Sequence, residues 1–316
     1  ITSYLWDFGD GTTSTEQNPF HTYAASGSYN VTLTISNAGG QTDSYSEAVT
    51  VVSTEVPVTP TIVDTTPILP DFNALSTILR PVYQNGVNLG NRATVFAKAG
   101  DVILTRGGIL APFATPSEYL LNGNENLQAI IDWFNSTDLN GTTSFNRTSV
   151  AMNRDWAAAD LLDPTLGDPV FCAAGETPLA CELRLTQPVI MFVAVGNNDV
   201  LLNTDPAAFQ NTLSQIVSTI AANGTIPVLL TIPDNGAVPA LQQINEAIIT
   251  VAQTNSVPLL NAARIVSELP GETFGPAPTG PADLSADAVN NFGVNAINLN
   301  LLRVLDAART IIFPDA

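Results

Sequence analysis

The sequence predicts an α/β domain over residues 71–316 that is preceded by a small all-β module over residues 1–52. Three observations lead to this. Apolar and polar residues alternate with period two over residues 29–36, which is typical of a half-buried strand. After residue 70, continuous apolar runs recur at similar intervals, as expected for strands that are covered on both faces. Segments with helical spacing separate these runs, and this alternation indicates a parallel sheet.

The all-β module consists of strands and turns. The run over residues 29–36 is followed by Gly39 and Gly40, a turn signal, and a second strand-like run ends at residues 49–52. Residues 53–70 hold five threonines and four prolines without a helical period. We expect this segment to be a stiff, extended linker.

The α/β domain is predicted from four strand runs and three helical segments. The expected strands cover residues 93–99, 188–195, 226–232 and 257–261. The expected helices lie around residues 209–220, 241–251 and 296–309. In sheets of this kind, ligands bind at the carboxyl ends of the strands. Any chemistry is therefore expected in the loops after Ala99, Val195 and Ile232.

The charge composition excludes several kinds of partner. The 316 residues include 29 acids and 10 bases, a formal net charge of −19. So few cations cannot hold nucleic-acid phosphates or an anionic lipid surface. No apolar run approaches the ~20 residues of a membrane helix. We expect neither nucleic-acid binding nor membrane insertion, and the start at Ile1 without a signal-peptide pattern indicates a processed or truncated chain.

The two cysteines, Cys172 and Cys181, lie close together in sequence. With a single histidine in the chain, they cannot complete a four-ligand zinc site without carboxylates. One disulfide and an oxidising location, extracellular or on the cell surface, are expected. Five Asn-x-Ser/Thr triplets are candidate glycosylation sites: Asn30, Asn135, Asn140, Asn146 and Asn223. No glycine-rich phosphate loop is present, and no cofactor is expected.

Three blocks near the amino end resemble the PKD domain, an immunoglobulin-like β-sandwich common in secreted and surface proteins. They are Trp-Asp-Phe-Gly-Asp-Gly at residues 6–11, Asn-Pro-Phe-His-Thr-Tyr at 18–23 and Gly-Ser-Tyr-Asn-Val-Thr-Leu at 27–33. In that family the first block follows opening strands, so the resemblance implies a sandwich without them. Truncation, strands supplied by a neighbouring copy, and a self-sufficient short variant are the three explanations.

Few residues of this module suggest chemistry. His21 lies in a strand-like segment and is interpreted as structural. Asp7 and Asp10 are weak candidates for Ca²⁺ ligands, since carboxylate oxygens suit that ion. An Asp-Gly pair is more often a simple turn, and no metal site is predicted.

Three segments of the α/β domain resemble the SGNH/GDSL hydrolases, a flavodoxin-like, three-layer family of esterases and carbohydrate deacetylases. They are Phe-Ala-Lys-Ala-Gly-Asp-Val at residues 96–102, Val-Gly-Asn-Asn-Asp-Val at 195–200 and Asp-Ala-Val-Asn at 287–290. The segment over residues 172–182 also looks like an insertion found in secreted bacterial members. The resemblance implies the fold of that family.

The catalytic residues of that family are not matched. The resemblance puts Val102 at the position of the nucleophilic serine and Asn290 at that of the histidine, and neither side chain can do that work. Gly196, Asn198 and Asp287 are the remaining matches. The family's second oxyanion donor is a backbone glycine in a block before the central strand, and no glycine lies between residues 141 and 167 to match it. Thr105 has no base near it in sequence, which makes it a poor substitute nucleophile.

We therefore predict a non-catalytic extracellular structural protein, a surface-layer or filament subunit, in which a pseudoenzyme fold serves as a building block. Its expected partners are further copies of itself or neighbouring surface proteins. One alternative is a secreted glycan-binding pseudo-esterase, with Trp133 and Trp156 as candidate aromatic contacts. A second alternative is an active carbohydrate esterase that uses unrecognised residues.

Overall fold

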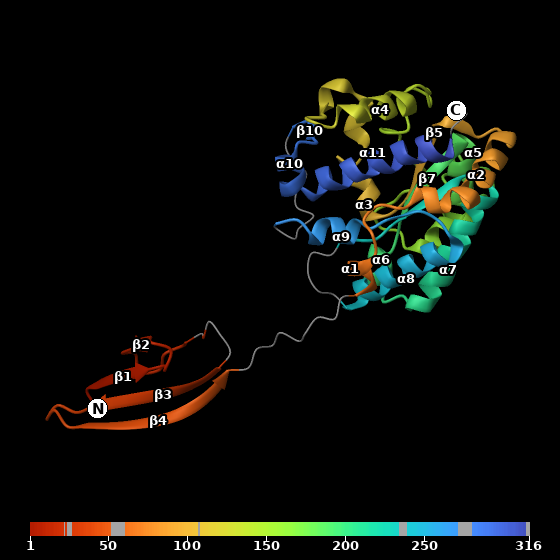
Figure 1. Cartoon of the computed structure of the whole chain (residues 1–316). Helices are drawn as coiled ribbons and strands as arrows, with labels where there is room; N and C mark the ends of the chain where they lie inside the picture. The colour runs from red at the N-terminus through yellow and green to blue at the C-terminus, as the bar shows by residue number, and fades with distance from the viewer. Residues whose placement is uncertain are drawn as a thin grey trace. The chain divides into compact units, whose positions relative to one another are not determined.

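The computed structural model describes residues 1–21, 23, 27–51, 61–106, 108–233, 239–270 and 280–313. The chain divides into two compact units, Ile1–Thr59 and Pro60–Ala316 (Figure 1). The first is built from strands, and the second combines strands with helices. The predicted fold class, an α/β domain preceded by a small all-β module, is confirmed.

The first unit contains one antiparallel sheet with the strand order β2-β1-β3-β4. Its strands are β1 Ser3–Asp7, β2 Thr13–Ser14, β3 Gly27–Ser36 and β4 Thr42–Val51. The period-two run lies in β3, as predicted. β3 and β4 form a long hairpin, and its turn uses Gly40 at a φ of +76°, a conformation that glycine adopts readily.

The two faces of this sheet differ in chemistry. Residues paired across antiparallel strands lie on the same face. The register pairs Trp6 with Leu33, Leu33 with Tyr45, and Tyr29 with Val49, so one face is mainly apolar, and β4 also places Asp43 and Glu47 on it. The opposite face is rich in serine and threonine. The described residues of this unit form a single layer, and Tyr45 and Val49 are 68% and 40% exposed.

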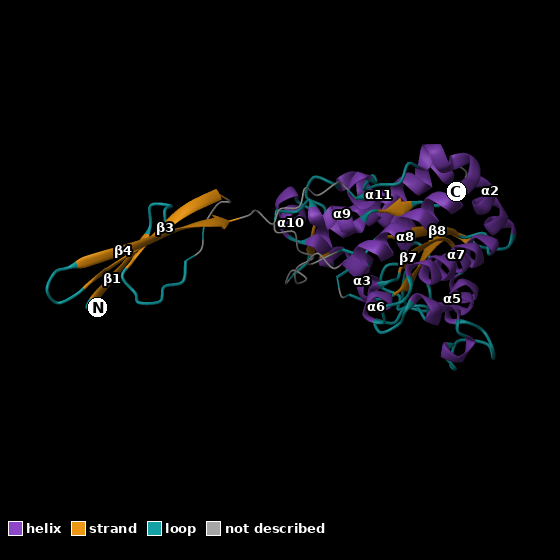
Figure 2. Cartoon of the chain, turned by 90° about the horizontal axis from the view of Figure 1, so that it is seen from below, coloured by secondary structure: helices purple, strands orange, loops and turns teal. Residues whose placement is uncertain are grey.

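The second unit is organised around a parallel sheet with the order β5-β7-β8-β9. The strands are β5 Arg92–Gly100, β7 Pro188–Ala194, β8 Ile226–Leu230 and β9 Leu259–Leu260. β7 and β8 are buried along their whole length, because helices cover both faces of the sheet. Figure 2 shows α11 on one side of the sheet and α5 and α7 on the other.

Eleven helices accompany this sheet within the described residues. The longer ones are α2 Phe72–Asn88, α4 Gln128–Asn135, α5 Pro178–Thr186, α7 Pro206–Ala222, α8 Pro239–Asn255 and α11 Gly293–Ile312. The shorter ones are α1 Ile62–Thr65, α3 Val102–Thr105, α6 Asn197–Leu201, α9 Ala262–Ser267 and α10 Ala286–Asn291. A small parallel pair, β6 Tyr119–Leu120 with β10 Ala282–Asp283, joins two distant segments. α7, α8 and α11 cover the three predicted helical segments.

The second unit begins earlier than the sequence indicated. The predicted linker ran over residues 53–70, but the unit starts at Pro60 and α1 lies inside that range. Thr61 and Asp64 form a reciprocal capping box at the start of α1. The Nδ2 of Asn261 donates to the carbonyls of Val63 and Thr66, at 2.8 and 3.1 Å. These contacts fix residues 61–66 to the domain. Residues 52–60 lie outside the described part.

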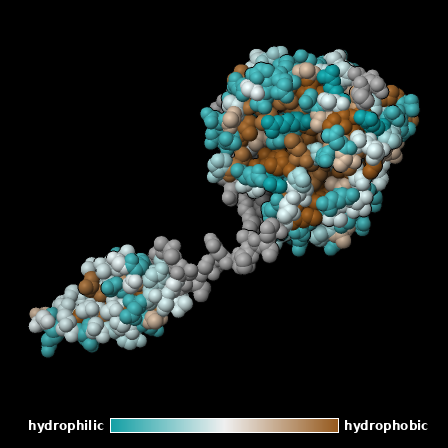
Figure 3. Space-filling model, in the orientation of Figure 1, coloured by the Kyte–Doolittle hydropathy of each residue, from teal (hydrophilic) through white to brown (hydrophobic). Residues whose placement is uncertain are grey.

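The predicted disulfide is confirmed. Cys172 and Cys181 are bonded, with 5.3 Å between their Cα atoms, and the bond ties the segment before α5 to that helix. On the face of the second unit shown in Figure 3, apolar side chains lie among polar ones. Among the described residues, no helix is both long and apolar enough to cross a membrane.

Candidate functional site

The carboxyl ends of β5 and β7 meet at two glycine-containing corners. Gly100 has a φ of +135°, and a Cβ atom there would lie 1.9 Å from the carbonyl oxygen of Ala194. Only glycine allows this approach. It lets the backbone N–H of Asp101 donate to the Ala194 carbonyl at 2.8 Å. The two strand ends are thereby locked together where the sequence predicts any chemistry to be.

Asp101 completes this lock with its side chain, which is fully buried. Its Oδ2 accepts from the backbone N–H groups of Gly196 and Asn197, at 3.0 and 2.9 Å. Its Oδ1 accepts from Nδ2 of Asn197 at 2.9 Å. Burial raises the pKa of Asp101 to about 6, while these hydrogen bonds act in the opposite direction. We call Gly100, Asp101, Gly196 and Asn197 the carboxyl-end junction.

Val102 directly follows this junction as the first residue of α3. Its aliphatic side chain is half-buried and has no nucleophilic atom. The hydroxyl of Thr105, one turn further along, donates to the carbonyl of Val102 at 3.2 Å. Thr105 thus makes a local helix contact.

Asn198 and Asp199 hold a neighbouring loop. The Nδ2 of Asn198 donates to the carbonyls of Arg154 and Trp156, at 2.7 and 2.8 Å. The Oδ2 of buried Asp199 accepts from the backbone N–H of Ala158 at 2.9 Å, and burial raises the pKa of Asp199. Both amide hydrogens of Asn198 can therefore be satisfied by backbone carbonyls.

Asp287 and Asn290 lie on α10, and both are exposed. Asn290 lines a pocket of about 450 Å³ beside Arg303 on α11, and neither Val102 nor Asn198 lines this pocket. The carbonyl of Asp287 accepts from Nδ2 of Asn291 within α10 at 2.7 Å. Among the described residues, no hydrogen bond or ion pair joins Asp287 or Asn290 to the carboxyl-end junction.

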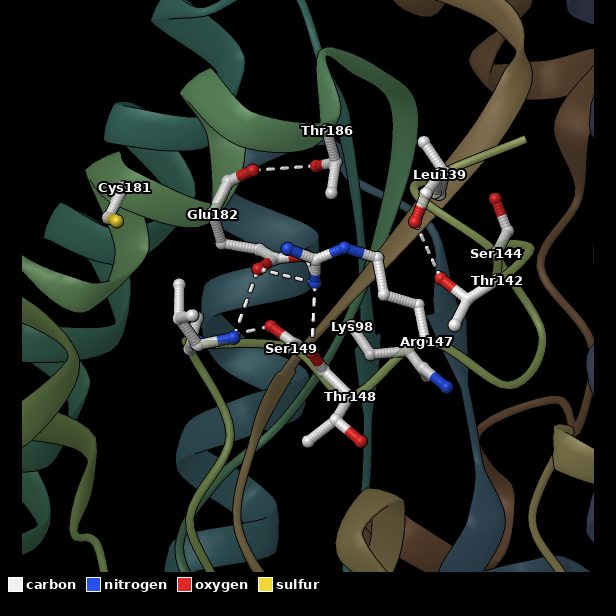
Figure 4. Close-up of polar contacts among 12 residues, drawn as sticks. Lys98, Leu139, Thr142, Ser144, Arg147, Thr148, Ser149, Cys181, Glu182 and Thr186 are labelled. Atoms are coloured by element: carbon white, nitrogen blue, oxygen red, sulfur yellow. Dashed lines mark hydrogen bonds and ion pairs between the residues drawn. The ribbon is translucent and has the colours of Figure 1, made fainter. Parts of the chain in front are cut away.

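A buried charged cluster lies beside β5, and no role for it is predicted from the sequence (Figure 4). Arg147 and Glu182 form an ion pair with a 3.0 Å Nη1–Oε1 distance, and Glu182 Oε2 also accepts from the N–H of Val150 at 3.0 Å. The Nζ of Lys98 donates to the carbonyl of Phe145 at 2.8 Å. Burial lowers the pKa of Lys98 to about 8 and raises the pKa of Glu182. The signal in the sequence was a single lysine inside an apolar strand.

The candidate calcium ligands make turn contacts. Asp7 Oδ1 accepts from the N–H of Gly9 at 2.9 Å. Asp10 Oδ1 accepts from the hydroxyl of Thr12 at 2.7 Å, and its Oδ2 lies 2.7 Å from Nε2 of His21. The Thr12 hydrogen bond is the main cause that lowers the pKa of Asp10 to about 2. His21 stacks on Phe8 with 4.0 Å between ring centres, so it packs within the module.

One group of three metal-ligand side chains occurs among the described residues: Cys172, Glu176 and Cys181. Its two sulfurs form the disulfide, so they are not thiolate ligands. Glu176 also pairs with Arg184, at 2.8 Å. This group therefore braces the loop before α5 and offers no metal site.

The glycosylation candidates fall into two groups. Three are exposed: Asn30, Asn140 and Asn146. The Nδ2 atoms of Asn135 and Asn223 are engaged, with the carbonyl of Phe113 at 2.8 Å and the hydroxyl of Thr225 at 3.3 Å.

The two candidate tryptophans are half-buried against the core. The Nε1 of Trp133 donates to the carbonyl of Ala93 at 3.2 Å. The guanidinium of Arg309 lies 4.1 Å from the centre of the Trp133 ring. Trp133 is therefore already occupied by contacts within the chain.

Together, these features define a chain with an antiparallel-sheet module and a parallel α/β domain whose carboxyl-end junction is held by a buried aspartate. Residues 1–52 match the family model described as PKD domain. The amino-terminal unit is a PKD domain. The match confirms the resemblance drawn from the Trp-Asp-Phe-Gly-Asp-Gly block.

Curated relatives match this PKD segment. Collagenase ColA from Bacillus cereus is 51% identical over 51 residues, which is 16% of this chain and 5% of the collagenase. Pre-pro-metalloprotease PrtV from Vibrio cholerae is 49% identical over 51 residues, or 16% of this chain and 6% of that protein. The chain thus spans only a small fraction of either relative.

Solved structures give three further similarities. The PKD1 domain of the Vibrio cholerae metalloprotease PrtV is 49% identical, with a TM-score of 0.16, and the match covers 16% of this chain and 63% of that one. A G-D-S-L family protein from Desulfitobacterium hafniense is 14% identical with a TM-score of 0.42, covering 67% and 99%. TesA is 17% identical with a TM-score of 0.38, covering 70% and 98%.

Proposed function

We propose that this chain is a non-catalytic extracellular structural protein, a subunit of a surface layer or filament. In this proposal the α/β unit is a building block without hydrolase chemistry. The PKD sheet joins copies of the chain by pairing strands between them. The observation that carries the proposal is the environment of Val102 at the carboxyl end of β5.

Asp101 and Asn198, polar side chains of the two motifs discussed above, bind backbone groups. Asp101 binds the N–H groups of Gly196 and Asn197, and Asn198 binds two loop carbonyls. Val102 itself has no nucleophilic atom. In a triad hydrolase, loss of the serine or the histidine alone lowers turnover roughly 10⁶-fold. A site with neither residue is expected to have no measurable esterase turnover.

Two features of the PKD sheet support assembly. Its mainly apolar face carries exposed Tyr45 and Val49 beside Asp43 and Glu47, and exposed apolar side chains on such a face favour association. β4 is a ten-residue strand at the edge of the described sheet. An edge strand presents unpaired backbone groups to which another strand can be added. The disulfide between Cys172 and Cys181 supports an extracellular location, because such bonds persist in oxidising compartments.

The enzyme question is tested with p-nitrophenyl acetate and longer p-nitrophenyl esters. We expect hydrolysis by the intact protein to equal that of a heat-killed sample. Hydrolysis above this background that disappears on Asp287→Ala would overturn the proposal in favour of an active esterase. Thr105→Ala serves as a second test variant, because it removes the hydroxyl on α3, one turn after Val102.

Assembly is tested by light scattering and negative-stain electron microscopy of the whole chain. We expect assemblies much larger than the 33.2 kDa chain. Tyr45→Lys and Val49→Lys place a charge on the apolar face and should abolish assembly. Thr50→Lys is the matched control, because its register position across from Ser28 puts it on the polar face of the same strand. A monomer at every concentration contradicts assembly, and equal effects of all three variants contradict a contribution of the face that carries Tyr45 and Val49.

A further inference from the structure

We propose that a pocket between the turn after β6 and helices α10 and α11 binds an uncharged sugar unit. We call it the Arg303 pocket. Its volume is about 450 Å³, and six of its lining residues matter here: Asn122, Asn124, Leu284, Asn290, Leu299 and Arg303. This proposal stands apart from the proposed function, because it concerns a different surface of the α/β unit.

The first argument is that the guanidinium of Arg303 has no partner within the described part of the chain. The sequence has ten lysines and arginines, all within the described residues. Nine of them contact a carbonyl, a carboxylate, an aromatic ring or another group of the chain. Arg303 has no such contact among the described residues. Arg303 lines the pocket, and none of its five N–H donors is used by the described residues, so these donors can serve ligand oxygens.

The second argument is the set of amide groups. Asn122 Nδ2 donates to Asp283 at 2.8 Å, and Asn124 Nδ2 donates to the carbonyl of Leu284 at 2.9 Å. These Nδ2 atoms donate to the protein, whereas the Oδ1 atoms receive no hydrogen bond from the described residues. The amide of Asn290 makes no hydrogen bond within the same part of the chain. A matching ligand must therefore supply several donors as well as acceptors.

The third argument is the floor of the pocket. Leu284 and Leu299 are buried side chains that present an apolar surface beneath the polar groups. Asn295 lies one helical turn before Leu299, on the same face of α11. It is 1% exposed, and neither its Nδ2 nor its Oδ1 has a partner among the described residues. Buried amides without partners are rare, and Asn295, which does not itself line the pocket, has none among the described residues.

The charge around the pocket selects an uncharged ligand. Asp283 binds Asn122, and Glu125 Oε1 accepts from the N–H of Gly123, so two carboxylates adjoin the lining residues. They offset the positive charge of Arg303, and the net charge of −19 further disfavours an anion. Sugar hydroxyls can donate to the amide oxygens and accept from the guanidinium, while C–H groups cover the leucines. A neutral sugar unit fits this combination.

The test is saturation-transfer NMR with glucose, N-acetylglucosamine, glucuronate and glucosamine as separate probes of the whole chain. We expect transfer to the two neutral sugars and weaker or no binding of the charged ones. Arg303→Gln and Asn290→Ala should each weaken neutral-sugar binding about tenfold or more, because a hydrogen bond to the ligand is lost. Arg154→Gln is the control: its side chain is 76% exposed and lies outside this pocket.

Three results would overturn the proposal. Absence of transfer to either neutral sugar rules out the ligand class. Equal binding by the wild type and Arg303→Gln rules out the site. Tighter binding of glucuronate than of glucose rules out the neutral ligand. None of these results depends on assembly or on esterase activity, so failure here is distinguishable from failure of the proposed function.

Discussion

Polar side chains of the same residue types make different contacts in two regions of the α/β unit. At the carboxyl-end junction and in the Lys98–Arg147–Glu182 cluster, polar side chains are buried and bound to backbone groups. In the Arg303 pocket, an arginine and three asparagines retain hydrogen-bonding groups that the described residues do not use. Residue type therefore does not distinguish a brace from a binding group. The distinction depends on whether the chain itself already uses the donors and acceptors of that side chain.

Arg147 and Arg303 show what this difference means for stability. Arg147 donates to Glu182 and to the carbonyl of Thr148, at 3.0 and 2.9 Å. Removing such a contact leaves buried partners unsatisfied, which costs free energy of folding. Arg303 has no contact of this kind within the described residues, so its removal costs little. Substitutions in the two regions should therefore separate into large and small effects on unfolding.

The largest effect is expected for Glu182→Ala. It leaves the Arg147 guanidinium and the Val150 N–H without their acceptor in a buried place. Breaking a buried ion pair by removing one partner costs about 3–5 kcal/mol. Chemical unfolding in guanidinium chloride measures the loss. Glu268→Ala is the control, because its ion pair with Arg264 is partly exposed and worth at most about 1 kcal/mol. Similar losses for the two variants would contradict the assigned role.

The second effect concerns pH and Lys98. Its folded-state pKa is about 8, below the ordinary value of 10.5, so between these pH values the unfolded chain holds the proton more strongly. Stability should therefore rise with pH across this window, by about 3 kcal/mol at ~1.36 kcal/mol per pKa unit. Lys98→Met should remove this rise. Unfolding curves of both proteins at pH 7.5 to 10.5 test it, and parallel pH profiles would contradict the prediction.

The fold was more predictable than the site. Continuous apolar runs and helical spacing identified β5, β7, β8, α7, α8 and α11, because burial on both faces leaves a local pattern in the sequence. α2 was not predicted. Pro81 lies inside this helix, and an internal proline obscures the helical signal that Phe72, Leu79 and Tyr83 provide. The linker boundary was misplaced because Asn261, distant in sequence, fixes the segment after Pro60.

The site residues depend on contacts that no local pattern records. Motif matches singled out Asn198, but its two carbonyl partners come from a loop more than forty residues earlier in the chain. Asp101 lies in one of the three motifs, but no role could be predicted for it. The three groups that donate to its carboxylate follow the neighbouring strand, far away in sequence. Arg303 had no motif at all. Its guanidinium is available because it makes no contact with the described residues, and no local sequence pattern records this.

A smaller effect is expected for Asn198→Ala. The carbonyls of Arg154 and Trp156 lose their donor, and each unsatisfied buried group costs about 1–3 kcal/mol where water cannot replace it. One of these two carbonyl contacts is exposed, so we expect the total loss to lie near the lower bound. Asn291→Ala is the control, since its Nδ2 binds the Asp287 carbonyl on the surface of α10. If the free energy of unfolding falls no more than in the control, Asn198 does not stabilise this loop.

The smallest effect is expected for Arg303→Gln, and it is the sharpest test of the comparison. Arg303 is exposed, and none of its donors is used by the described residues. Surface substitutions of this kind change stability by less than about 0.5 kcal/mol. Guanidinium unfolding should therefore give the wild-type midpoint, while sugar binding falls. A destabilisation comparable to that of Asn198→Ala would mean that Arg303 has a structural role after all. The distinction between bound and available polar groups would then fail at this residue, because one side chain would both stabilise the fold and bind the ligand.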